Sequence, residues 1–209
     1  MTERANASKL AYLPVTSFVQ NVASRAPVPG GGSVAALAGS MGSALSVMVC
    51  RISASKMGDE LRLHFEEVEQ TVMKYRDQLR DLVDADSDAY DAVIAAGRDA
   101  SDDKDRVMEA YRQAAEVPLE TARVCFEALA PLPELARKAF KGAVTDVGVA
   151  ALMLRSGLIG ARYNVLVNLP SVGDEAFADR CRTDLDAWVE QADRLAAETT
   201  AAVESALSK

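Results

Sequence analysis

Residues 34–50 read VAALAGSMGSALSVMVC, an apolar run built largely from alanine, glycine and serine. Small side chains of this kind let a helix approach its neighbours closely, so the run predicts a buried, tightly packed core helix. It is short for a bilayer and is interrupted by Gly39, Gly42 and three serines, which argues against a membrane span. The run is also more apolar than a surface helix with one buried side requires. We therefore expect part of it to contact a second subunit.

Helical patterns continue along the chain, and strand and hairpin patterns are almost absent. Ser33 and Thr145 stand at expected N-cap positions, and Pro118 is expected to kink or break its helix. The segment after Thr145 is apolar almost all round, which is typical of a helix at the centre of a bundle. These patterns predict an all-α protein, a single-domain bundle of about six helices over residues 1–209, with central apolar helices. The expected helices are 16–25, 33–56, 59–97, 103–130, 134–140, 146–169 and 174 to the C-terminus, with a polar loop at 98–105.

Charge and cysteine content narrow the possible functions. A net charge of −8 and a pI near 4.8 argue against nucleic acid as a partner, because phosphates demand a basic surface. Cys50, Cys125, Cys181 and the lone His64 fit no zinc or redox spacing, so we expect no metal and simple buried thiols. The first ten residues lack the apolar core of a secretory signal. We expect a cytoplasmic protein that binds a small molecule and no membrane.

The densest glycine cluster, Pro29-Gly30-Gly31-Gly32-Ser33, directly precedes the small-residue helix. Glycines let the backbone press against a ligand, and with Ser33 as N-cap the loop amides would lie at the positive end of the helix. Such a loop predicts a site for an anion or a polar heterocycle. No P-loop lysine follows the loop and no strand precedes it, which argues against a nucleotide phosphate.

Three polar residues of the apolar segment 146–169 are candidates for a functional site. Asn164 and Asn168 are four residues apart and share one face. A buried amide needs partners, so the pair either bonds a neighbouring helix or binds a ligand. Asp146 lies in the first turn, where a carboxylate favours the helix dipole whatever else it does.

Asp86 lies in LVDADSDAYD, a run that contains four carboxylates. On helical spacing Asp84, Asp88 and Asp91 share one face, whereas Asp86 points toward the apolar side of the helix. A carboxylate withdrawn from solvent has a shifted pKa, which general acid–base catalysis requires. Asp86 is therefore a candidate catalytic group.

Four blocks occur in the order and spacing of one known family: PVPGGGSVAALAGSMGSALSVMVCRIS, LVDADSDAYDAV, EVPLETA and TDVGVAALMLRSGLIGARYNVLVNL. From about residue 14 to 205 the chain resembles the formiminotetrahydrofolate cyclodeaminase and methenyltetrahydrofolate cyclohydrolase family. The resemblance implies an all-helical fold, a homodimer or a higher assembly, a tetrahydrofolate derivative as substrate, and no metal or redox cofactor. It also implies a pocket that includes Pro29, Gly30, Gly31, Gly32, Ser33, Asp86, Asp146, Asn164 and Asn168, with Lys56 at a basic position common in the family.

One block departs from the family pattern. A stretch that is usually rich in glycine and asparagine reads KAFKGAVTD here, with Thr145 in place of serine and the asparagine missing. We expect one wall of the pocket to differ.

The spacing of these candidates constrains how one pocket could form. Along a continuous helix Asp146 and Asn164 would be ~27 Å apart, and Ser33 and Lys56 about 35 Å apart. They meet only if a helix breaks, for example at Gly157 or at Gly160, or if an antiparallel partner supplies the distant residues. We expect a homodimer in which each site draws residues from both subunits.

The family's reactions both pass through a tetrahedral carbon between two folate nitrogens, so one acid–base group serves either. We expect hydrolysis of 5,10-methenyltetrahydrofolate to 10-formyltetrahydrofolate, with Asp86 or Asp146 as the acid–base group. The asparagines would hold polar edges of the folate, and the Gly30–Gly32 amides and Lys56 would bind its oxygens. The alternative is formiminotetrahydrofolate cyclodeaminase, which the stand-alone length disfavours because deaminases often accompany a transferase. A non-enzymatic all-α oligomerisation module is the third alternative.

Overall fold

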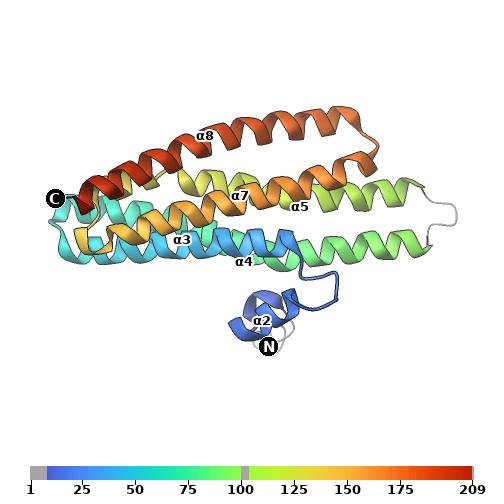
Figure 1. Ribbon diagram of the computed structural model, residues 1–209, viewed down its shortest axis with the longest axis horizontal. Helices are drawn as coiled ribbons and strands as arrows, with labels where there is room; N and C mark the ends of the chain where they lie inside the picture. The colour runs from blue at the N-terminus through green and yellow to red at the C-terminus, as the bar shows by residue number, and fades with distance from the viewer. Residues whose placement is uncertain (1–8, 100–103, 209) are drawn as a thin grey trace.

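The computed structural model describes residues 9–99 and 104–208, and within them it contains helices and no strand. This confirms the all-α prediction. The elements are η1 (Leu10–Tyr12), α2 (Val15–Val22), α3 (Gly31–Lys56), α4 (Asp59–Asp99), α5 (Lys104–Leu129), α6 (Leu132–Lys138), η2 (Lys141–Ala143), α7 (Val144–Val172) and α8 (Glu175–Leu207) (Figure 1).

The long helices α3, α4, α5 and α7 form a four-helix bundle, in which α3 packs on α4 and α7, and α5 packs on α4 and α7. The last helix, α8, lies along α7 and α5 on the outside of this bundle. The short helix α2 lies on the opposite side of the bundle from α8 (Figure 1). The amphipathic helices α4 and α8 expose their polar faces. The apolar helices α3 and α7 are direct neighbours.

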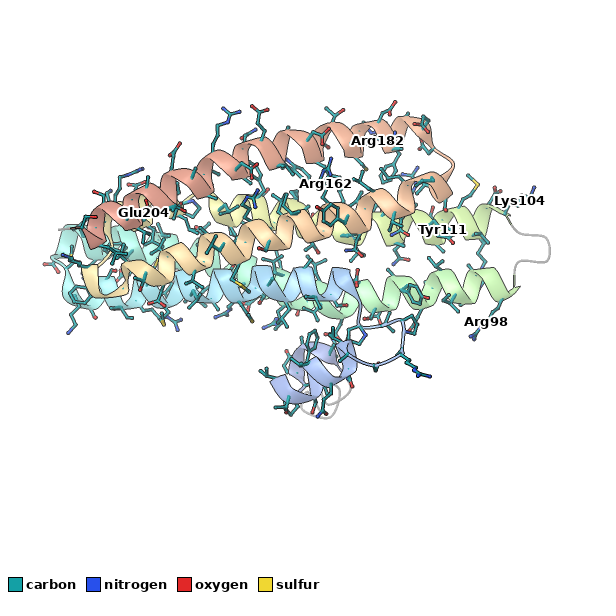
Figure 2. All side chains as sticks on the ribbon, viewed as in Figure 1. Arg98, Lys104, Tyr111, Arg162, Arg182 and Glu204 are labelled. Atoms are coloured by element: carbon teal, nitrogen blue, oxygen red, sulfur yellow. The ribbon has the colours of Figure 1, made fainter. Side chains whose placement is uncertain are left out.

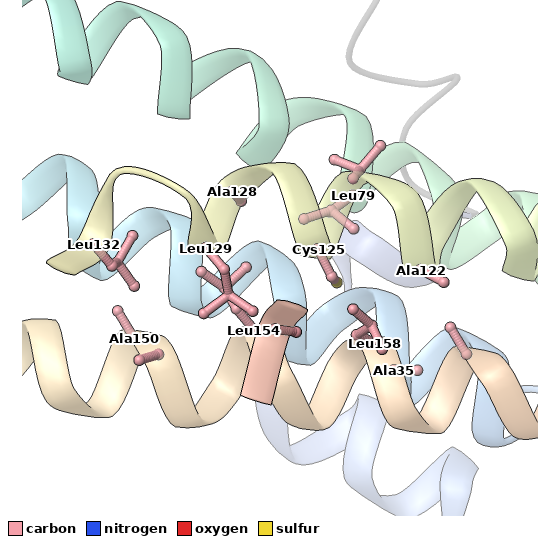
Figure 3. Close-up of a cluster of buried hydrophobic side chains, with 14 of the residues drawn as sticks. Ala35, Leu79, Ala122, Cys125, Ala128, Leu129, Leu132, Ala150, Leu154 and Leu158 are labelled. Atoms are coloured by element: carbon pink, nitrogen blue, oxygen red, sulfur yellow. The ribbon is translucent and has the colours of Figure 1, made fainter. Parts of the chain in front are cut away.

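Small residues set the distance between α3 and α7. A Cβ atom added at Gly42 would lie 2.8 Å from the Ala150 carbonyl oxygen, and one at Gly157 would lie 2.8 Å from the Ala35 carbonyl oxygen. Only glycine permits such contacts, and the tight packing predicted for residues 34–50 is confirmed. The surrounding core includes Leu154 and Leu158, which are fully buried (Figure 3).

The cysteines are buried and free, as expected. Burial raises the pKa of Cys50 to about 12, and it also raises the pKa of Cys125 and Cys181. A thiol that stays protonated is a poor nucleophile. These side chains therefore act as small core residues.

Two of the expected helix caps are wrong. The N-cap of α3 is Gly30, whose extended backbone starts the helix at Gly31, so Ser33 lies inside the first turn. Because the turn η2 runs directly into α7, that helix begins at Val144 and its N-cap is Ala143, not Thr145.

Pro118 was expected to kink or break its helix, and the break is ruled out because α5 continues through it from Lys104 to Leu129. A proline inside a helix leaves the carbonyl four residues earlier without its N–H partner. Here that carbonyl belongs to Ala114, and the side-chain amide of Asn168 on α7 donates to it at 2.9 Å. A neighbouring helix therefore supplies the missing donor.

Candidate active site

A cavity of about 440 Å³ lies where the loop before α3 meets α4, α5 and α7. Its volume falls in the range of roughly 300–1,000 Å³ that is typical of small-molecule sites. Six of the predicted residues line it: Gly30, Gly31, Gly32, Asp86, Asn164 and Asn168. Segments far apart in the sequence thus converge on one pocket.

Asp86, on α4, lies against the first turn of α3. Its Oδ2 accepts a hydrogen bond from Ser33 Oγ at 2.9 Å, and the carboxylate also accepts the Ser33 backbone N–H. The first N–H groups of a helix have no partner within the helix, and Gly30 offers no side chain to cap them. Asp86 therefore does from α4 what an N-cap residue would normally do.

Burial raises the pKa of Asp86, and this effect outweighs the two hydrogen bonds from Ser33, which lower it. The carboxyl group consequently holds a proton more readily than an exposed aspartate does. Such a group is suited to accept and return a proton during a reaction.

Ser87, the next residue on α4, extends this hydrogen-bonded unit. Its Oγ is 3.2 Å from Ser33 Oγ, and both serine side chains are buried. A hydroxyl has one hydrogen, and Ser33 gives its own to Asp86 when the carboxylate is ionised. Ser87 is then the donor to Ser33.

The asparagine pair on α7 is bonded to backbone carbonyls and also lines the cavity. Asn164 Nδ2 donates to the Gly160 carbonyl oxygen at 2.9 Å, and Asn168 Nδ2 donates to the carbonyl oxygens of Ala114 and Asn164, both at 2.9 Å. Both side chains also line the cavity. Bonding between helices and ligand contact are therefore compatible.

Several lining residues were missed from the sequence. Tyr90, Val93 and Ile94 follow Asp86 at helical spacing on the same face of α4, so the periodicity alone could have indicated them. Tyr111 comes from α5 (Figure 2), and no local pattern relates it to Asp86. The tyrosines and the aliphatic side chains give the cavity apolar walls around its polar groups.

The remaining candidates lie outside the cavity lining. Pro29 is buried beside it, and Ser33 stands behind Asp86. Lys56 ends α3, and Asp146 lies in the first turn of α7. Because both helices are continuous, the expected alternative of a break at Gly157 or Gly160 is wrong, and one chain does not bring these two residues to the cavity.

An exposed apolar face runs along α3 and α7. Its members recur at intervals of three, four, seven or eleven residues, as in a helix–helix seam. Its most exposed members are Val34, Met41 and Met48 on α3, and Val149, Leu152, Tyr163 and Val167 on α7. α7 lies at the centre of the bundle, as expected, in contact with α3, α5 and α8. In this chain by itself, however, one side of the helix is open to solvent: Leu152 is 61% exposed and Val167 is 71% exposed.

By length and composition alone, Gly31–Lys56 and Lys141–Val172 could each cross a membrane. Their most apolar windows are 61% and 44% buried inside the protein, respectively. Core helices of soluble proteins pass the same test.

The family profile described as "Formiminotransferase-cyclodeaminase" matches residues 14–187. The chain is 33% identical over 189 residues to the methenyltetrahydrofolate cyclohydrolase of Methylorubrum extorquens, covering 87% of this chain and 91% of that enzyme. It is 35% identical to the formimidoyltransferase-cyclodeaminase of Sus scrofa, covering 90% of this chain but only 36% of the pig protein.

The fold is also similar to a solved structure. The crystal structure of formiminotetrahydrofolate cyclodeaminase from Thermotoga maritima superposes with a TM-score of 0.88 and 26% sequence identity. The match covers 95% of this chain and 100% of that one.

Proposed function

The chain belongs to the formiminotransferase-cyclodeaminase family, and from this premise we propose that it hydrolyses 5,10-methenyltetrahydrofolate to 10-formyltetrahydrofolate. It is an enzyme of folate one-carbon metabolism, and the non-enzymatic oligomerisation module is set aside. The observation that carries the proposal is that Asp86 is a partly buried carboxylate with a raised pKa and lines a cavity of suitable size. The cyclohydrolase relative, matched over 91% of its length, supports hydrolysis as the reaction.

In the proposed mechanism Asp86 first acts as a general base. The substrate is a cation, and a water oxygen bonds to its methenyl carbon while Asp86 takes one proton from that water. The product of this step is a neutral hydroxyl intermediate. Asp86 then returns its proton to the N5 nitrogen as the C–N5 bond breaks. The hydroxyl oxygen forms the formyl C=O and its proton leaves to solvent, so one proton is released per turnover.

The other cavity residues have binding roles in this proposal. Tyr90 and Tyr111 would cover the faces of the pterin ring, since aromatic rings favour stacked contacts. The asparagines would bond its polar edge, and amides of Gly30–Gly32 would bind an oxygen of the substrate. In both steps Asp86 only takes or returns a proton and no electrons are exchanged with an oxidant or reductant, so the reaction as proposed needs no metal or redox cofactor.

Cyclodeamination is the second candidate, favoured by the similarity to the Thermotoga maritima structure. There one folate nitrogen attacks the formimino carbon, and Asp86 would give its proton to the departing ammonia. The same residues therefore serve either reaction.

A homodimer would complete the site. The face on α3 and α7 is apolar and exposed, and a second copy would remove it from water. The two helices are antiparallel, because Gly42 lies against Ala150 and Gly31 lies beside Asn164. With a two-fold axis near Met41, the partner's Asp146 would come to about the level of Ser33, and the partner's Lys56 to about the level of Asn168.

This dimer would also cover the cavity, since Val167 belongs both to the cavity lining and to the exposed face. Lys56 would then meet the anionic end of a folate, and Asp146 would balance the substrate cation. We place this enzyme in the cytoplasm. Analytical ultracentrifugation of Leu152→Glu tests the dimer, and we expect this variant to sediment as a monomer. A wild-type protein that is active as a monomer would contradict the dimer. A wild-type protein that stays in solution only with detergent would also contradict it.

Ultraviolet absorbance separates the two reactions. We expect the purified protein to remove the methenyltetrahydrofolate absorbance far faster than Asp86→Asn does. A protein that instead generates this absorbance from formiminotetrahydrofolate, and does not hydrolyse the methenyl compound, is the deaminase. A protein that converts neither methenyltetrahydrofolate nor formiminotetrahydrofolate would overturn the proposed function.

A further inference from the structure

Pro118 creates a gap in the hydrogen bonding of α5 at the wall of the cavity. Proline has no backbone N–H, so the Ala114 carbonyl oxygen lacks the partner that an α-helix normally provides. Ala114 lines the cavity, and Pro118 itself is buried. A buried carbonyl without a donor is unfavourable, and the gap needs a donor from elsewhere.

Asn168 fills that gap and is fixed by doing so. Its two amide hydrogens go to the carbonyl oxygens of Ala114 and Asn164, each at 2.9 Å. Carbonyl oxygens only accept hydrogen bonds, so the chemistry of these partners determines which end of the amide is nitrogen. The orientation of Asn168 is therefore set by the backbone of two helices.

The other end of this amide stays available. Asn168 Oδ1 accepts no hydrogen bond from the described residues and is not among their buried unpartnered atoms, while the side chain lines the cavity. Asn168 thus offers a ligand an acceptor and no free donor. Ionised Asp86, in the same cavity, is a second acceptor.

We propose that Pro118 is a positioning residue for substrate specificity: the gap it leaves at Ala114 holds Asn168 with Oδ1 toward the bound ligand, where it accepts an N–H from a heterocycle. This rests on the proposed function in one respect, since the amino and lactam N–H groups of a pterin are donors of the required kind. A heterocycle with an acceptor at that position would leave Oδ1 unpaired and would bind more weakly.

Pro118→Ala tests the proposal. Alanine restores the N–H that bonds Ala114 and favours the helix, so the variant should fold at least as well as the wild type. The amide of Asn168 then loses a fixed partner, and we expect KM for methenyltetrahydrofolate to rise about tenfold with kcat little changed. An unchanged KM would overturn the proposal.

A double-mutant cycle shows whether Pro118 acts through Asn168. In an Asn168→Ala background, Pro118→Ala should have no further effect on KM, and an effect that persists would contradict the proposal. Hydrogen exchange of the Asn168 side-chain amide in the free protein gives a readout independent of activity. We expect protected hydrogens in the wild type and faster exchange in Pro118→Ala, and equal exchange would overturn the inference even if no folate is turned over.

Discussion

Ser33 Oγ donates a 2.9 Å hydrogen bond to Asp86 Oδ2, joining two helices across 53 residues of sequence. The same carboxylate accepts the Ser33 backbone N–H, and it lies so close to Gly32 that no side chain fits between them. The start of α3 and the carboxylate thus form one structural unit. A change to either partner should affect both the helix and the chemistry.

Asp86→Asn should lower kcat by about two to four orders of magnitude, because an amide neither takes a proton from water nor returns one. The asparagine oxygen still accepts the bonds from Ser33, so the fold should survive. Steady-state kinetics and circular dichroism check both statements. Asp88→Asn is the matched control on the same helix, where the carboxylate is exposed. Comparable activity of the two variants would remove Asp86 from the mechanism.

Gly32→Ala should inactivate the enzyme without removing any functional group. A Cβ at this position would lie 1.9 Å from Asp86 Oδ1, so the carboxylate must move away from the helix start. We expect a loss of kcat close to that of Asp86→Asn. Gly97→Ala, which introduces a Cβ with nothing within 4 Å, should have wild-type activity. A fully active Gly32→Ala would show that the position of this carboxylate is not critical.

Much of this site followed from local sequence rules. The glycine cluster, the inward position of Asp86 and the shared face of the asparagines all depend on spacing within one element. Tyr111 was missed because it reaches the cavity through the packing of α5. Pro118 does not break α5, which its own sequence could not indicate, because Asn168 from another helix replaces the missing hydrogen bond. The exposed face of α7 was not foreseen, because an apolar sequence does not specify whether its own chain or a second copy covers each side.

Ser87→Ala should raise the pKa of Asp86 further. Without a hydrogen bond from Ser87, the Ser33 hydroxyl is a weaker donor to the ionised Asp86 carboxylate. The ionised form of Asp86 is then less stable relative to its protonated form. We expect the acidic limb of the pH profile of kcat/KM to move to higher pH. Ser46→Ala removes another buried serine hydroxyl of the bundle, which donates to the Gly42 carbonyl, and this variant should leave the profile unchanged. Identical profiles for the two variants would contradict the role of Ser87.

The raised pKa of Asp86 also has a consequence for stability. The folded state binds this proton more tightly than the unfolded state does, so the contribution to stability is complete below the unfolded pKa. It is lost as pH rises through the folded pKa. Urea unfolding from pH 3 to 8 should therefore show the wild type losing stability relative to Asp86→Asn as pH increases. A constant difference would mean that the hydrogen bonds from Ser33 cancel the effect of burial, and an opposite trend would mean that they outweigh it.

The shared site makes a prediction that concerns mixtures of inactive variants. If each site combines Asp86 of one subunit with Asp146 of the other, a heterodimer of Asp86→Asn and Asp146→Asn has one intact site and one doubly altered site. When equal amounts of the two variants exchange subunits at random, half of the dimers are heterodimers with one intact site each. The mixture should then regain about a quarter of the wild-type activity. Mixing Asp86→Asn with Ser33→Ala should restore nothing, because both changes lie on the same side of the site and every site is damaged. If the first mixture also stays inactive after subunit exchange, Asp146 does not act across the interface.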